Sequence, residues 1–132
     1  MLTSVQIPAA AAVAILAHAE RDVPREACGL LVGAGATVAR HEPATNADAS
    51  TTRYRIPAAQ HFAVVRAARR DGFDVIGAYH SHPRSAAVPS VTDTAEAFPG
   101  FVFLIAGLVP GPHLRAWHLV DGNFTELRLV RT

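Results

Sequence analysis

The sequence has 132 residues, half of them apolar, so it is long enough to bury one core and is predicted to form a single globular domain, residues 1–132. A net charge of +1 excludes the strongly basic surface typical of nucleic-acid-binding proteins. The single cysteine, Cys28, excludes an internal disulfide framework and fits a reducing compartment.

The N-terminal third is predicted to form a strand, a helix and a β-hairpin. Residues 3–7 have the length of a short strand. A helix is expected from Ala9 to about Arg21, because alanine has the highest helix propensity. The apolar run Ala27–Val32 is followed by glycines and is expected to pair with Thr37–His41 as a hairpin.

The apolar run Pro8–Ala17 could be compared with a signal peptide, but residues 1–7 lack the Lys and Arg of a charged n-region. The run is also too short to span a bilayer, and so is Phe101–Val109. Both runs are therefore interpreted as core elements. We expect a soluble, cytoplasmic protein with no membrane or nucleic-acid partner; a homo-oligomer is compatible with the sequence.

The rest of the chain alternates between loop, helix and strand patterns. Residues 43–56 are polar and are predicted to be a long loop, a kind of segment that is usually functional in a compact domain. A second helix is predicted from Pro57 to Gly72. Further strands are predicted at Phe101–Leu108, His113–Val120 and Phe124–Val130, with Asp121-Gly122 as a two-residue hairpin turn. The predicted fold class is α/β, with helices packed against a mixed β-sheet.

Two histidines, His80 and His82, follow the apolar run Phe73–Tyr79, which is predicted to be a buried strand. Side chains at positions i and i+2 of a strand point to the same face, so both imidazoles can be directed at one point while Ser81 points away. Pro83 lacks a backbone donor and is expected to end the strand. The pair therefore predicts two ligands of a metal ion.

Ser90 and Asp93 follow at the predicted start of a helix from about Val91 to Phe98. Two imidazoles and the Asp93 carboxylate would make a three-ligand Zn²⁺ site with its fourth position left for water, as in catalytic zinc sites. A structural zinc would need a fourth protein ligand, which Cys28 could supply. Ser-x-x-Asp is also a capping-box pattern, so Ser90 could cap the helix, face the metal ion, or do both.

An open zinc site usually works with a carboxylate that takes the proton of the attacking water. Glu26, directly before the predicted strand Ala27–Val32, is a candidate for this base. Position alone does not favour it over Glu42 or Glu96.

The segment Glu26-Ala-Cys-Gly-Leu-Leu-Val-Gly, then Asn46, and then His80-Ser-His-Pro with Ser90 and Asp93 resembles the JAMM (MPN+) metalloprotease family. The family pattern begins with an upstream glutamate, which is followed later by His-x-His. Seven residues, the first of them Pro, separate the second His from a Ser, and two residues separate this Ser from an Asp. Every element of this pattern is present. The resemblance implies the cytidine-deaminase-like JAMM fold and an active enzyme, because no ligand position is degenerate as in the inactive MPN− members.

Carried over to this sequence, the resemblance implies a role for each residue of the motif. One Zn²⁺ ion per chain would be bound by His80, His82 and Asp93. Glu26 would take a proton from the attacking water and return it to the leaving amine, and Ser90 would donate a hydrogen bond to the oxyanion.

The resemblance also implies a protein partner. Family members cleave amide or isopeptide bonds after the C-terminal glycine of ubiquitin-like proteins, and this short chain resembles small bacterial and archaeal members that process sulfur carriers or their conjugates. We expect the Gly-Gly tail to lie in a groove alongside an exposed strand, between the 43–56 loop and the Arg84–Pro89 loop. The alternatives are a cell-wall or phage-tail peptidase of the same fold, or a non-catalytic carrier-binding or assembly module.

Overall fold

The computed structural model describes residues 1–96 and 100–132. Over these residues the chain forms seven strands and three helices, with the helices interspersed among the first five strands. In sequence they are β1 (Ser4–Ile7), α1 (Ala9–Asp22), β2 (Cys28–Ala34), β3 (Thr37–Ala44), α2 (Ala58–Arg70), β4 (Asp74–His82), α3 (Val91–Glu96), β5 (Val102–Gly107), β6 (His113–Val120) and β7 (Asn123–Arg131).

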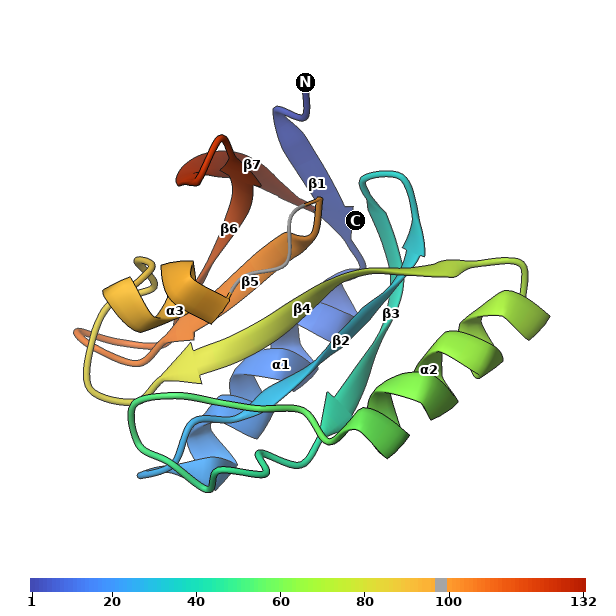
Figure 1. The fold of residues 1–132 in the computed structure, drawn as a ribbon. Coiled ribbons are helices and arrows are strands. Elements are labelled where there is room, and N and C mark those ends of the chain that lie inside the picture. Colours follow the sequence, from blue (N-terminus) through green and yellow to red (C-terminus); the bar gives the residue numbers. More distant parts are fainter. Residues whose placement is uncertain (97–99) are drawn as a thin grey trace.

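The strands form one mixed sheet that closes on itself in the order β1-β3-β2-β4-β5-β6-β7 (Figure 1). β4 and β5 are parallel, and β1 runs parallel to both of its neighbours, whereas the other pairs are antiparallel. The ring closes where Ser4 of β1 pairs with Arg128 of β7. The predicted mixed α/β fold is confirmed. Closure of the sheet was not predicted, because it depends on a pairing between the two ends of the chain.

The two long helices pack against opposite faces of the sheet. Ile15 of α1 belongs to an apolar cluster that includes Tyr79 of β4. Val64 of α2 packs against a second cluster that includes Ala78, the residue before Tyr79. Because neighbouring residues of a strand point to opposite faces, α1 and α2 lie on different sides of β4. Figure 1 shows α1 crossing behind β2 and β4.

Most predicted elements are confirmed, with changes at their ends. β3 continues to Ala44, so the loop begins two residues later than predicted, and β4 includes both histidines. Asp121 and Gly122 have positive φ angles of 50° and 78°, which suit a tight hairpin turn. The predicted third helix begins at Val91, as expected, but its predicted end at Phe98 lies outside the described residues. Within the described ranges, no helix is both long enough and apolar enough to traverse a bilayer.

Candidate metal centre

The end of β4 positions two imidazoles. β4 lies between β2 and β5, and His80 and His82 project from one face of it with their Nε2 atoms 3.3 Å apart. Ser81 points to the other face, as predicted. Its Oγ accepts the Ala27 N–H at 2.8 Å, and its own N–H donates to the Ala27 carbonyl at 3.0 Å. These two bonds join β4 to Ala27, the residue that follows Glu26.

The third donor comes from the first turn of α3. Asp93 places Oδ1 3.0 Å from Nε2 of His80 and Oδ2 3.0 Å from Nε2 of His82. All three residues are buried, and one donor atom from each lies within 4.8 Å of the others, so the group could hold a metal ion. The structure therefore brings together the three ligands that the sequence predicts.

Cys28 does not complete this group. In the part of the chain that the structure describes, the donor cluster contains His80, His82 and Asp93 only. Cys28 is buried on β2, and burial raises the pKa of its thiol to about 12. Because Cys28 lies outside the donor group, the alternative of a site closed by Cys28 is not supported.

Ser90 and Asp93 form the predicted capping box. The hydroxyl of Ser90 accepts the Asp93 N–H at 3.1 Å, and Oδ2 of Asp93 accepts the Ser90 N–H at 2.9 Å. This reciprocal pair fixes the first turn of α3 and thereby fixes the direction of the Asp93 carboxylate. The capping function of the motif is thus confirmed, and it also serves the metal centre.

Hydrogen bonds set the charge and orientation of the ligands. Nδ1 of His82 donates to the Ala86 carbonyl at 2.9 Å, so Nε2 is the ring nitrogen that faces the other members of the donor group. Burial lowers the pKa of His82, but hydrogen bonds to Asp93 and Ala86 outweigh it and the pKa is raised. Burial opposes ionisation of Asp93, but hydrogen bonds from His80, His82 and Ser90 hold its pKa far below the ordinary value. The third ligand is therefore an anion at neutral pH.

The loop that carries Ala86 is clamped by β6. The Ala87 N–H donates to Nε2 of His113, and the Ala87 carbonyl accepts from Nε1 of Trp117, each at 3.0 Å. Gly107 allows this approach, because a Cβ there would lie 2.4 Å from the Ala87 nitrogen. Sequence reasoning missed both clamping residues. Their only signal was strand alternation, which places positions 113 and 117 on one face of β6.

Glu26 lies at the mouth of the site. Its side chain is buried at 3% exposure, its N–H donates to the Ser50 carbonyl at 2.8 Å, and its carbonyl accepts from Asn46 at 3.1 Å. A cavity of about 220 Å³ is lined by Glu26, His82 and Ser90. Its other walls come from Pro83 and from the two loops that the sequence singled out, through Thr51, Thr52, Arg84 and Ser85. The predicted base, one metal ligand and the predicted oxyanion donor therefore share one opening.

The alternative bases are placed differently. Glu42 lies on β3 and accepts a hydrogen bond from Nε of Arg40 at 3.0 Å. It does not line the cavity shared by Glu26 and Ser90. The side chain of Glu96 lies outside the described part of the chain.

Asn46 organises the loop before α2. Its Oδ1 accepts the N–H groups of Asp48 and Arg55, each at 3.1 Å, and its Nδ2 also donates to the Arg53 carbonyl at 2.9 Å. The loop then places the ring of Tyr54 against His80, with centroids 4.6 Å apart and planes 17° from parallel. Tyr54 thus covers one metal ligand and shields it from water.

The strand that carries the two histidines, β4, has no free edge. β4, which carries the histidines, is hydrogen-bonded to β2 on one side and to β5 on the other. A substrate tail therefore cannot add to β4 as a further strand, because both of its edges are already paired. Two segments that belong to no strand border the donor group: the loop that carries Tyr54, which stacks on His80, and the loop that carries Ala86, which bonds to His82.

Comparison with known proteins gives a consistent result. Residues 8–120 match the family model described as prokaryotic homologs of the JAB domain. The chain is 38% identical over 118 residues to the CysO-cysteine peptidase of Mycobacterium tuberculosis, covering 86% of this chain and 81% of that protein. It is 35% identical over 124 residues to the desampylase of Haloferax volcanii, covering 88% of each.

A solved structure supports the fold. The solution structure of protein DSY2949 from Desulfitobacterium hafniense superposes with a TM-score of 0.87 at 29% identity, covering 97% of this chain and 92% of that one. The family match spans most of the chain and includes the strand and helix that carry the donor group. The glutamate and the His-x-His motif of the sequence indicated the same family. This chain therefore belongs to the prokaryotic branch of the JAB/MPN family.

Proposed function

We propose that this chain is a zinc-dependent peptidase that hydrolyses the amide bond after the C-terminal glycine of a ubiquitin-like or sulfur-carrier protein. The observation that carries the proposal is the meeting of a three-donor group with Glu26 and Ser90 at one opening. The names of two relatives, a CysO-cysteine peptidase and a desampylase, support the substrate class.

The spacing of the donors supports zinc. Ligand atoms about 2.0–2.1 Å from a tetrahedral Zn²⁺ ion lie about 3.3 Å from one another. The two Nε2 atoms are 3.3 Å apart, and the Asp93 carboxylate faces both of them, with Oδ1 3.0 Å from His80 and Oδ2 3.0 Å from His82. Three protein ligands leave a fourth position, as catalytic zinc sites do.

The residues around the donor group divide the reaction between them. A bound zinc ion would lower the pKa of water and polarise the scissile carbonyl. Glu26 takes the proton of the attacking water and returns it to the leaving amine, a role for which its buried position beside the cavity is suited. Ser90 donates a hydrogen bond to the oxyanion, and the Ala86 carbonyl keeps His82 in the required tautomer.

Ser90 is proposed to act both as a helix cap and in catalysis, and a glycine substitution separates these roles. Glycine is an acceptable N-cap, so Ser90→Gly should lower stability by only a few tenths of a kcal/mol. It removes the hydroxyl, however, and is expected to lower kcat by about 10²–10³-fold with metal content unchanged. Thermal unfolding and steady-state kinetics measure the two effects. Unchanged kcat would show that Ser90 is a cap only.

The proposed function is tested with a panel of small β-grasp carriers whose Gly-Gly C-terminus is extended by one residue or by a lysine-linked peptide. Zinc-loaded protein is expected to release the extension, as detected by mass spectrometry, and chelated protein is not. Cross-linked cell-wall peptides form a second arm. Cleavage of those peptides alone would favour the cell-wall alternative, and carrier binding without cleavage would favour a non-catalytic module; either would contradict the proposal.

A further inference from the structure

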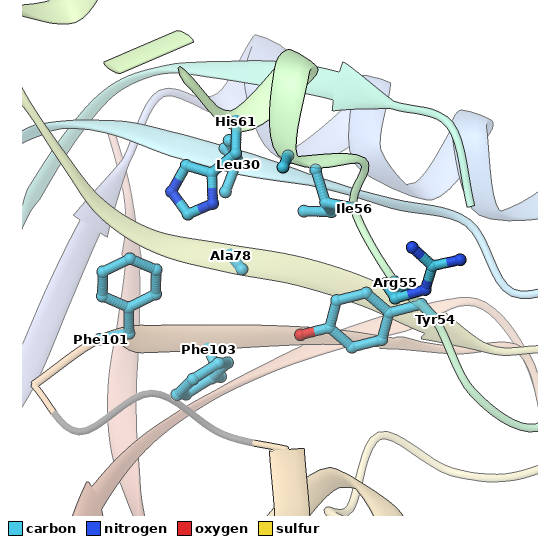
Figure 2. A pocket seen from close by; sticks show the side chains of 9 residues that line it. Leu30, Tyr54, Arg55, Ile56, His61, Ala78, Phe101 and Phe103 are labelled. Atoms are coloured by element: carbon cyan, nitrogen blue, oxygen red, sulfur yellow. The ribbon is translucent and has the colours of Figure 1, made fainter. Parts of the chain in front are cut away.

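A second cavity lies on the same side of β4 as the metal ligands. Its volume is about 270 Å³, and its walls are largely apolar. Figure 2 shows Leu30 and Ile56 on one side of the cavity and Phe101 and Phe103 on the other, with Ala78 of β4 between them. None of the steps assigned above to Glu26 or Ser90 uses this space.

The cavity lies next to the metal centre. Ala78 precedes His80 by two residues and projects from the same face of β4, a step of about 6.6 Å along the strand. Leu30 of β2 and Phe103 of β5 are the direct neighbours of Ala78 across the sheet. Tyr54 forms a shared wall, because it lines the cavity and its ring also stacks on His80.

We propose that this cavity is a specificity pocket that receives one apolar side chain of the carrier tail, at the third or fourth residue before the scissile bond. The inference rests on the proposed function. An extended peptide advances about 3.3 Å per residue, so with the first residue's carbonyl at the metal centre, the third and fourth residues lie about 7 and 10 Å away. Ala78, a wall of the cavity, lies about 6.6 Å along β4 from His80, which is a comparable reach.

The chemistry of the walls defines the occupant. The volume is below the roughly 300–1,000 Å³ of sites for whole small molecules, so the cavity suits a single side chain. Its polar side chains include Arg55, which is already engaged by Asp48 at 3.1 Å, and His61. Aliphatic or aromatic side chains would therefore be stabilised by burial, whereas alanine or serine would fill little of the space.

Two neighbouring alanines allow a matched test. Ala58 and Ala59 are both exposed in the first turn of α2, but only Ala58 lines the cavity. Ala58→Trp places a large ring at the pocket without altering the buried core, and Ala59→Trp is its control. The substrates are β-grasp carriers ending in Gly-Gly plus one extra residue, with leucine, alanine or serine placed in turn at the third and fourth positions.

Wild-type protein is expected to cleave the leucine carrier with a kcat/KM at least about tenfold above the alanine carrier, mainly through KM, at one of the two positions. Ala58→Trp should remove this preference and Ala59→Trp should keep it. Equal kcat/KM for all tails, or equal behaviour of the two tryptophan variants, would overturn the pocket while leaving the proposed function intact. If no carrier is cleaved at all, the proposed function itself is overturned, and the pocket with it.

Discussion

Replacing Glu26 by glutamine is expected to lower kcat by about 10²–10⁴-fold while the chain still binds one metal ion. Glutamine has nearly the same shape, so the buried position before β2 is preserved. It cannot accept a proton from the attacking water, however, and position 26 is not a member of the donor group of His80, His82 and Asp93. Steady-state cleavage of an extended carrier and metal analysis of the purified variant measure the two properties.

The control for this experiment is Glu42→Gln. Glu42 is the other candidate base whose side chain the structure describes, and it is held by Arg40 on β3, away from the cavity. Its replacement is expected to leave kcat within a factor of two. A large loss in Glu42→Gln with little effect in Glu26→Gln would reassign the base and contradict the proposed chemistry.

Replacing Asp93 by asparagine is expected to remove metal binding and, with it, cleavage. Asp93 contacts both imidazoles and supplies the only negative charge among the three donors. The asparagine Oδ1 can still accept the Ser90 N–H, so the first turn of α3 should remain capped. Titration calorimetry with Zn²⁺ is expected to show an affinity at least about 100-fold lower than that of the wild type, at the upper end of metal-site perturbations.

Thermal unfolding provides a readout of the same change that does not depend on activity. Zinc at about 100 times its Kd should stabilise the wild type by about 2.7 kcal/mol, because it binds the folded state. This corresponds to a rise of several degrees in Tm. Asp93→Asn should show no such rise, whereas Asp74→Asn, at the exposed start of β4, should behave as the wild type. A zinc-dependent rise in Asp93→Asn would show that the ion binds elsewhere.

The donor group of His80, His82 and Asp93 could be predicted from sequence because its geometry is local. Two-residue spacing on a strand places His80 and His82 on one face, and the Ser90–Asp93 spacing is set by one turn of helix. Both spacings follow from the regular geometry of strands and helices, which is the same whatever the sequence. Even the uncertainty over Ser90 concerned its role and not its position.

Other parts of the site could not be found in this way. Choosing Glu26 over Glu42 required the family resemblance, because the contact between Ala27 and Ser81 joins segments far apart in the chain. The stacking of Tyr54 on His80 and the clamp from Trp117 also depend on long-range packing. No periodicity along the sequence encodes which side chains of distant strands and loops will meet.

The closed ring has a consequence for how the protein is made. One edge of β1 pairs with β7, beginning at Ser4 and Arg128, and Thr132 donates a backbone hydrogen bond to Ile7. On the ribosome, β1 is made before the other described elements, and that edge stays uncovered until β7 has been made. Val5 and Ile7, fully buried in the finished molecule, cannot complete their packing before then, because their cluster includes Leu127 of β7. Val5 and Ile7, which lie where the sheet closes, are thus the apolar residues that stay at risk of aggregation for the longest time during synthesis.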